Sequence, residues 1–312
     1  GRVYWRRPDV LIFINGLPMV FVELKNSIVK VEEAYNDNLK NYLRDIPNLF
    51  AFNQICVLSN GLETRLGAFN ATYNHFFEWL KVNSEKERPD RQALKEAGTV
   101  GESSVRYFID GLLRKDRLVD YIENFIMFRN QKNKIIAKNH QYFGVNNLME
   151  SVKNRAELQG KLGVFWHTQG SGKSFSMVFF ARKVRRKIPG NFTFLIITDR
   201  EDLDDQIHKN FVKTEVIGQK EECQPKNGKQ LRDYLQTNKS FIFTLIHKFR
   251  YDKGKKYPVL STRDDIIVLV DEAHRTQYKD LAENMRTALP NANYIAFTGT
   301  PLLGSKRLTN QW

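Results

Sequence analysis

A short run of glycines, a lysine and a serine has the residue types and spacing to bind phosphate. The run is His167-Thr168-Gln169-Gly170-Ser171-Gly172-Lys173-Ser174, between strand-like residues 162–166 and a helix expected over 175–187. The two glycines let the turn curl so that backbone N–H groups converge on an anion, and the helix N-terminus adds partial positive charge. The lysine can reach the β- and γ-phosphates of a nucleotide, and the serine hydroxyl can ligate Mg²⁺. The sequence therefore predicts a phosphate-binding loop, with His167 in place of the usual first glycine.

A second polar motif, Asp271-Glu272-Ala273-His274, directly follows the apolar run 266–270. Asp271 is expected to hold the Mg²⁺ that Ser174 also ligates, and Glu272 to polarise the water that attacks the γ-phosphate. His274 is expected to link the nucleotide state to Thr298 and Thr300. The two motifs together predict a site for ATP and Mg²⁺.

Gln141 lies upstream of the loop, in the run Asn139-His140-Gln141-Tyr142-Phe143. Its side-chain amide is expected to read adenine. The alternative is a solvated glutamine at the start of a helix.

A second set of charged residues lies near the beginning of the chain. Residues 9–14 and 19–25 predict two strands, and Asn15-Gly16 is a strong hairpin signal between them. In that hairpin Asp9 lies opposite residues 22–24, and Glu23 and Lys25 share a face. Two carboxylates supply oxygen ligands for Mg²⁺, and a neighbouring lysine can activate water. The alternative is a surface ion pair, but Glu23 and Lys25 end an otherwise apolar strand, which favours a metal site with Asp9, Glu23 and Lys25 as catalytic residues.

The elements that must position these residues follow from hydrophobic patterning. A helix is expected over 31–44, a third strand of the first sheet over 54–59, and helices over 104–129. Residues 81–101 are charged and predict an exposed insertion, and the polar run 131–138 predicts a connection between domains. Four near-continuous apolar runs then predict the strands of a buried parallel sheet: 192–198, 240–245, 266–270 and 294–297. We therefore expect an α/β protein with domains at 1–134 and 135–312.

The composition indicates which kinds of partner and which cellular compartment to expect. The 312 residues carry a formal net charge of +14, with a pI near 9.6, which favours a polyanionic partner such as nucleic acid. Two cysteines are too few for a disulfide framework, so a reducing cytoplasm is expected. No apolar run approaches the length of a membrane span. The sequence opens without methionine, which predicts a piece of a longer chain.

These motifs resemble known families. Pro8-Asp9, thirteen residues and then Glu23-Leu24-Lys25 resemble the PD-(D/E)xK nuclease core, and Asn38 with Tyr42 is similar to a helical Gln-x-x-x-Tyr element of some such nucleases, with Asn in place of Gln. The phosphate loop, the run 198–206 and the motif 271–275 resemble the first RecA-like domain of superfamily 2 helicases. Their combination closely resembles the motor and restriction (R) subunit of type I restriction enzymes, over nearly the whole chain.

The resemblance implies a restriction-endonuclease-like domain, incomplete at its N-terminus, followed by a RecA-like parallel-sheet domain. It implies a type I site-specific deoxyribonuclease: ATP-dependent translocation on double-stranded DNA, coupled to Mg²⁺-dependent endonucleolytic cleavage, with methyltransferase (M) and specificity (S) subunits as partners. Asp199, Arg200 and residues 244–247 then fall where contacts to the duplex backbone are expected. The basic run 182–187 is expected to form a solvated outer face rather than a DNA contact.

Two other readings stay open. One is a nuclease–helicase of DNA repair, which cuts without partner subunits. The other is a DNA-binding module with an ATP switch and an inactive nuclease, against which the retained Asp9, Glu23 and Lys25 argue. The sequence ends at Trp312, after the third motor motif and before a second RecA-like domain, so this piece is expected to hydrolyse ATP slowly and not to translocate. For Asn38 and Tyr42, an ordinary helix surface stays open as the alternative to a role in the nuclease.

Overall fold

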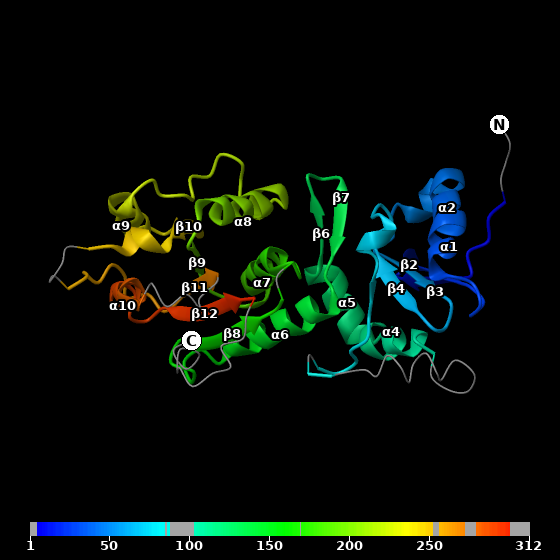
Figure 1. Ribbon diagram of the computed structural model, residues 1–312, viewed down its shortest axis with the longest axis horizontal. Helices are drawn as coiled ribbons and strands as arrows, with labels where there is room; N and C mark the ends of the chain where they lie inside the picture. The colour runs from blue at the N-terminus through cyan, green and yellow to red at the C-terminus, as the bar shows by residue number, and fades with distance from the viewer. Residues whose placement is uncertain are drawn as a thin grey trace. The chain divides into compact units, whose positions relative to one another are not determined.

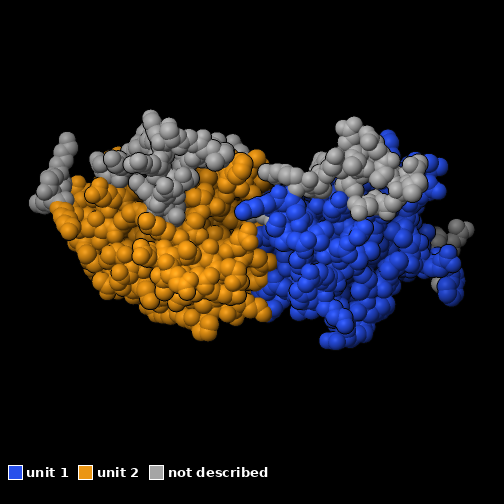
Figure 2. Space-filling view, turned by 90° about the horizontal axis from the view of Figure 1, so that it is seen from below, with its two compact units in different colours: residues 1–143 blue, residues 144–312 orange. Residues whose placement is uncertain are grey.

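The chain folds into two compact units, residues 1–143 and 144–312 (Figure 2). The computed structural model describes residues 5–84, 86–87, 103–168, 170–251, 256–271 and 279–299. Each unit contains its own five-stranded sheet, and the elements are labelled along the chain in Figure 1. Within those ranges no helix is long and apolar enough to cross a membrane.

The first unit is built on a sheet of order β1-β2-β3-β4-β5. The hairpin predicted from Asn15-Gly16 is confirmed: β1 (Val10–Ile14) pairs antiparallel with β2 (Leu17–Leu24). Asn15 (φ 50°) and Gly16 (φ 79°) both adopt the left-handed conformation that such a two-residue turn requires. Parallel pairing joins β2 to β3 (Ile55–Ser59), and β4 (Thr64–Gly67) and β5 (Phe77–Glu78) follow antiparallel.

The helix predicted over 31–44 is present and includes a π-helical stretch. It runs as α1 (Val31–Glu33), the π-helix η1 (Ala34–Leu39) and α2 (Lys40–Asp45), and short 3-10 turns follow at Pro47–Phe50 and Tyr73–His75. This helix lies beside β2, β3 and β4 (Figure 1). Its apolar face joins a buried cluster with the sheet, composed of Phe21, Val31, Ala34, Leu39, Tyr42, Phe50, Cys56, Leu58 and Phe76.

The helical prediction for 104–129 is right at first and wrong at its end. Two helices form, α4 (Val105–Leu112) and α5 (Lys115–Asn124), but β6 (Ile126–Arg129) is a strand that pairs with β7 (Asn133–Ile136). The boundary placed after residue 134 falls inside β7, whereas the units divide between residues 143 and 144. Most of the insertion expected over 81–101 lies outside the described residues.

The second unit is built on a parallel sheet of order β10-β9-β11-β12-β8. Each of the four strands predicted after the phosphate loop is present to within one residue at either end. The strands are β8 (Lys161–Trp166), β9 (Thr193–Thr198), β10 (Phe241–Leu245), β11 (Ile266–Asp271) and β12 (Asn293–Thr298). All five run parallel, so their carboxyl ends share one edge, where the polar motifs begin.

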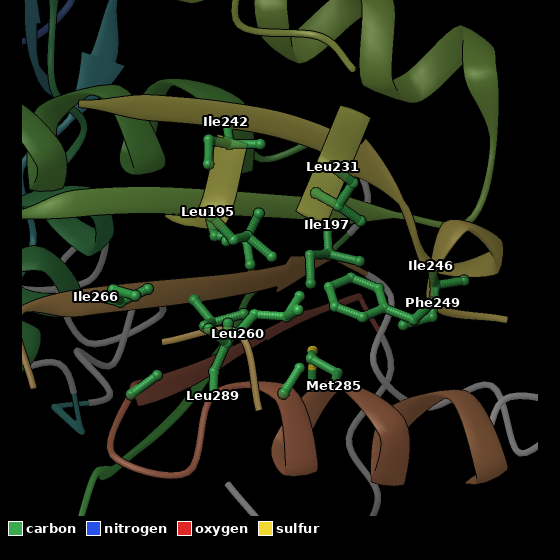
Figure 3. Close-up of a cluster of buried hydrophobic side chains, with 14 of the residues drawn as sticks. Leu195, Ile197, Leu231, Ile242, Ile246, Phe249, Leu260, Ile266, Met285 and Leu289 are labelled. Carbon is green, nitrogen blue, oxygen red and sulfur yellow. The ribbon is translucent and has the colours of Figure 1, made fainter. Parts of the chain in front are cut away.

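Helices cover both faces of this sheet. Rings of α7 (Lys173–Lys187) and α8 (Glu201–Lys213) pack on Phe194, Phe241 and Phe243. Alternate residues of the same strands point to the opposite face, where they meet α9 (Gly228–Gln236), the 3-10 turn η5 (Ile246–Phe249) and α10 (Lys279–Ala288). In Figure 3, which shows that second cluster, Ile242 and Leu231 lie at the top, Leu195 and Ile197 below them, and Met285 and Leu289 at the bottom. The helix α6 (Asn139–Lys153) precedes β8.

The outer edge of β10 is bordered by residues 222–225. Phe243 donates its backbone N–H to the Cys223 carbonyl oxygen at 2.8 Å. Lys239 Nζ donates to the Glu222 carbonyl oxygen at 2.8 Å, and Lys248 Nζ to the Pro225 carbonyl oxygen at 2.5 Å. These contacts fasten a short segment beside an edge strand and limit its pairing with other chains.

Candidate nucleotide and metal sites

The predicted phosphate loop has the backbone geometry of an anion cradle. Gly170 (φ 79°) and Gly172 (φ 91°) are both left-handed, and Gly172 is the residue immediately before α7. Ser171 N–H donates to the Thr168 carbonyl oxygen at 3.2 Å, which closes the turn. A side chain at position 172 would cost about 1–2 kcal/mol in this conformation. Gln169 lies outside the described residues.

The start of the loop is fastened to the neighbouring strand β12. His167 donates its backbone N–H to the Thr298 carbonyl oxygen at 3.2 Å, and Trp166 Nε1 donates to the Gly299 carbonyl oxygen at 3.4 Å. The His167 ring packs edge-on against Phe165, with ring centres 4.3 Å apart. His167, the residue that replaces the usual glycine, therefore serves to anchor the loop.

Lys173 and Asp271 meet at the carboxyl edge of the sheet. Lys173 Nζ lies 3.7 Å from Asp271 Oδ1, and the two side chains are only 13% and 10% exposed. They come from α7 and the end of β11, although β12 separates β11 from β8. Ser174 is half-buried in the first turn of α7. The structure thus brings together Lys173 and Asp271, while Glu272, His274 and Thr300 lie outside the described residues.

Gln141 lies in the first turn of α6 and is buried rather than solvated. Its Oε1 accepts a hydrogen bond from the Lys138 backbone N–H at 2.9 Å. The side chain therefore satisfies a backbone donor at the start of the helix, which is a role that the sequence did not indicate.

The ends of β9 and β10 carry the residues expected near a duplex backbone. Arg200 is engaged by Asp202, with Nη2 2.7 Å from Oδ2, and the pair is exposed. Partial burial, and then the cationic neighbours Lys248 and Arg250, lower the pKa of His247. Lys248 and Arg250 therefore place positive charge beside His247 at the end of β10.

The expectation of a fully solvated basic face on α7 is only partly right. Lys183 is buried, and its Nζ donates to Asn146 Oδ1 at 2.6 Å. Burial, and then Arg186, lower the pKa of Arg182. Arg185, Arg186 and Lys187 are exposed in the last turn, where cations stabilise the negative end of a helix.

The hairpin of the first unit places Asp9 beside Glu23. The last ladder pair is Val10 with Val22, so Asp9 comes opposite Glu23 in the same register. Asp9 Oδ2 accepts the Leu24 backbone N–H at 2.8 Å, which continues the pairing through a side chain. The predicted proximity of the two carboxylates is therefore present in the structure.

Glu23 is buried, with 3% of its surface exposed. Its Oε1 accepts a hydrogen bond from Asn38 Nδ2, and its Oε2 is buried without a hydrogen bond from any described residue. Burial, and then the nearby Asp9 carboxylate, raise the pKa of Glu23 to about 7, whereas Lys25 acts in the opposite direction. A buried oxygen of this kind, next to a second carboxylate, is a fitting ligand for a divalent cation.

The donor set bounds the kind of metal site that is possible here. In the described part of the chain no group of three or more His, Cys, Asp or Glu side chains is placed to hold a metal ion. Asp9 and Glu23 would therefore supply two oxygens, and water, backbone carbonyl or substrate oxygens would complete the shell. Such an oxygen-rich and partly hydrated shell is what Mg²⁺ prefers.

Arg6 and Asp45, which the sequence did not single out, lie next to this site, beside Tyr42, which the sequence had singled out. Asp45 Oδ2 accepts from Arg6 Nε at 2.8 Å, and the Tyr42 hydroxyl donates to the Arg7 carbonyl oxygen at 2.9 Å. The available signal was the spacing of Asn38, Tyr42 and Asp45, which puts them on one helix face.

Comparison with known proteins gives two family matches. The description of the first is "SWI2/SNF2 ATPase", and it covers residues 140–312. The second, "Type I restriction enzyme R protein N terminus", covers residues 3–75. The two matches confirm the resemblance to the R subunit of type I restriction enzymes, and each match contains one of the two candidate sites.

Curated relatives extend the similarity over nearly the full chain. A putative type I restriction enzyme MjaIXP endonuclease subunit of Methanocaldococcus jannaschii is 35% identical over 96% of this chain and 30% of its own length. The type I restriction enzyme HindI endonuclease subunit of Haemophilus influenzae is 36% identical over 95% of this chain and 30% of its own length. The chain thus spans about a third of the length of these relatives. Among solved structures, the UvsW helicase from bacteriophage T4 aligns with a TM-score of 0.44 at 14% identity, over 77% of both chains, which is too low to establish a shared fold.

Proposed function

This chain belongs to the SWI2/SNF2 ATPase family, and on that premise we propose that it is part of the restriction subunit of a type I restriction enzyme. In this proposal the second unit is a RecA-like motor that moves double-stranded DNA with ATP, and the first is a PD-(D/E)xK nuclease that cuts it. The relatives named as endonuclease subunits support the assignment. The observation that carries it is the meeting of Lys173 and Asp271 at the carboxyl edge of a parallel sheet.

At the nucleotide site, the chain's own groups bind and orient phosphate. The loop from Gly170 to Ser174 presents backbone N–H groups and the N-terminus of α7 to an anion. Lys173 lies beside Asp271 in this structure. When a nucleotide is bound, Lys173 would contact its terminal phosphates instead. Ser174 and Asp271 would hold Mg²⁺, which supplies charge neutralisation on the phosphates when bound. Glu272 is proposed to position the attacking water, and His274 to sense the nucleotide. Gln141 is proposed to read adenine. The remaining loop residues, Thr168, Gln169 and Ser171, are proposed to line the phosphate site.

At the nuclease site, Asp9 and Glu23 would hold Mg²⁺, which when bound stabilises charge on the phosphodiester. Lys25, the half-buried residue directly after the end of β2, is proposed to hold the attacking water. Asn38 orients Glu23 through the hydrogen bond to Oε1. The M and S subunits are proposed as partners because the chain is similar to endonuclease subunits of type I restriction enzymes.

The test uses the whole protein with the M and S subunits of its system, in the cytoplasmic setting proposed for it. Cleavage of unmethylated and methylated DNA is measured together with ATP hydrolysis. Lys173→Ala is expected to abolish both activities on unmethylated DNA, because the ammonium contacts the transferred phosphate. Asp9→Ala is expected to abolish cutting and leave ATP hydrolysis intact.

Lys187→Ala is the matched control, since Lys187 is an exposed lysine at the far end of the same helix. It is expected to behave like the unmodified protein in both assays. Cleavage without ATP by the Lys173→Ala protein would contradict the restriction assignment and favour a nuclease–helicase of DNA repair.

A further inference from the structure

Residues 7 and 8, directly in front of Asp9, have restricted backbone conformations. Pro8 fixes its own φ and restricts Arg7 to extended conformations. Trp5, one residue before Arg6, is 93% exposed. Residues 6–8, called the strap below, lead directly into Asp9. The position of the strap therefore determines the position of the Asp9 backbone and, with it, of the Asp9 carboxylate.

One face of the helix 31–45 touches both sides of the candidate metal site. Asn38, Tyr42 and Asp45 are four and three residues apart, so they line the same face. Asn38 donates to Glu23, the Tyr42 hydroxyl donates to the Arg7 carbonyl oxygen at 2.9 Å, and Asp45 accepts from Arg6. Asn38 lies within the π-helical stretch η1, a kind of irregularity that is frequent at functional sites. The helix thus holds Glu23 with one residue and the strap with the next two.

In the contact between Arg6 and Asp45, the Asp45 side chain has little access to solvent, whereas the Arg6 side chain is 28% exposed. Arg6 Nε and Nη2 lie 2.8 and 2.5 Å from Asp45 Oδ2, and the Asp45 side chain is 3% exposed. Arg44 Nε also donates to Asp45, at 2.7 Å from Oδ1. Hydrogen bonding from Arg44, and then from Arg6, lowers the pKa of Asp45 to about 2, so the carboxylate stays charged throughout the usual assay range.

We propose that the Arg6–Asp45 ion pair is a positioning pair for the metal site: it fixes the strap on the helix so that Asp9 faces Glu23 before a metal arrives. The inference rests on the proposed nuclease function of the first unit. The Leu24 N–H orients one carboxylate oxygen of Asp9. The Arg6–Asp45 pair instead fixes the position of the backbone in front of Asp9. Losing the pair should therefore weaken metal binding without abolishing it. Mutating a residue that holds a metal ligand in place commonly lowers the metal affinity by about 10–100-fold. The lower end of that range applies here, because Asp45 acts on Asp9 through the strap.

The test is Asp45→Asn in the full chain, with Mn²⁺ alone as the probe. Calorimetric titration is expected to show a dissociation constant for Mn²⁺ at the Asp9–Glu23 site raised about tenfold. In EDTA, hydrogen exchange of the backbone amides of Arg7 and Asp9 is expected to be faster than in the unmodified protein. ATP hydrolysis is expected to be unchanged, because the second unit keeps its own site.

The matched control is Arg44→Gln, which removes the other partner of Asp45 without touching the strap. It is expected to leave the Mn²⁺ affinity and the amide exchange unchanged. Arg6→Gln is expected to reproduce the effect of Asp45→Asn from the strap side, and Arg6→Lys to restore most of the affinity.

The outcomes separate this inference from the proposed function. If Asp45→Asn lowers the thermal midpoint but leaves the Mn²⁺ affinity and the exchange of residues 7–9 unchanged, the pair is structural only and the inference is overturned. If Asp9→Ala loses Mn²⁺ binding while Asp45→Asn keeps it, the inference fails and the nuclease assignment stands. If Asp9→Ala binds Mn²⁺ as well as the unmodified protein, both fail.

Discussion

Glu23 lies in surroundings that disfavour its own negative charge. It is buried, one of its oxygens accepts no hydrogen bond from the described residues, and Asp9 faces it across the hairpin. A carboxylate of this kind weakens the metal-free fold and becomes useful when a cation is bound. Sites that store destabilisation in this way are typical of functional positions.

Glu23→Gln is therefore expected to stabilise the metal-free protein. The pKa of Glu23 in the fold is raised from 4.5 to about 7, so the native state is penalised once the pH exceeds 4.5, and fully above about 7. After discounting for solvent screening, the free energy of unfolding at pH 8 should rise by about 1–2 kcal/mol. The gain should shrink as the pH falls from 7 toward 4.5. Urea unfolding in EDTA at several pH values measures it.

Magnesium provides the control for that experiment. Mg²⁺ is expected to raise the unfolding midpoint of the unmodified protein and not that of the Glu23→Gln protein, because the amide is a poor ligand for a hard cation. An equal response of both proteins to Mg²⁺ would show that Glu23 is not a ligand.

The residues of this site that could be predicted from the sequence are those positioned by the pairing of neighbouring strands. Asn15-Gly16 sets the register at the turn, and an irregularity between Ile12 and Phe13 shifts the pairing by one residue, so that Asp9 comes opposite Glu23. The burial of Glu23 and the Arg6–Asp45 contact join residues far apart in sequence, and no local pattern encodes them. The phosphate loop and Asp271 were expected to share one site because strand ends of a parallel sheet converge on one edge, and Lys173 of the loop lies beside Asp271.

At the scale of elements, α6 approaches the phosphate loop closely at Gly144. A Cβ built on Gly144 would lie 2.6 Å from Phe165 Cε2 and 3.3 Å from His167 Cε1. Phe165 is itself packed on Phe297, with ring centres 4.8 Å apart, so it has little room to move. The absence of a side chain at Gly144 thus lets a helix rest on the strand that leads into the loop.

Gly144→Ala is expected to displace Phe165 and His167. Overpacking of this kind costs about 1–3 kcal/mol, offset by up to about 1 kcal/mol of helix propensity. The net result should be a loss of about 1–2 kcal/mol in stability and a several-fold weaker affinity for ATP, measured by urea unfolding and by nucleotide titration. Lys153→Ala, at an exposed position of the same helix, is the control. Unchanged ATP affinity in the Gly144→Ala protein would show that the loop is positioned independently of α6.

Strands were predicted well where they are long and apolar, and badly where they are short. The hairpin of β6 and β7 was missed because each strand has only four residues: Ile126–Arg129 continues the apolar pattern of the preceding helix, and Asn133–Ile136 lies in a run that is otherwise largely polar. Lys134 looked like part of a solvated connection, yet it is buried, its Nζ donates to the Asn53 carbonyl oxygen, and burial lowers its pKa to about 8. The turn of Asn130 and Gln131, both with positive φ, carries no glycine to announce it.

At the scale of the whole molecule, each unit has its own sheet and its own buried cluster. Separate cores predict two unfolding transitions. A non-hydrolysable ATP analogue with Mg²⁺, at about 100 times its dissociation constant, should stabilise the second unit by about 2.7 kcal/mol. For a unit of this size that is a rise of roughly 5–10 °C in one midpoint only, as followed by calorimetry.

The Lys173→Ala protein is the control for that scan, since it should lose the ligand-induced rise while keeping both transitions. A single transition, or an equal rise in both midpoints, would contradict independent cores.

The segment beside β10 has a further consequence for how this fold can vary. A sheet is enlarged when new strands add at its borders, and here residues 222–225 already occupy the border along β10. Among the described residues β8, the strand that leads into the phosphate loop, pairs only with β12 and lies at the opposite border. A new strand could therefore be added to this sheet at β8. Such a strand would lie next to the strand that leads into the nucleotide loop.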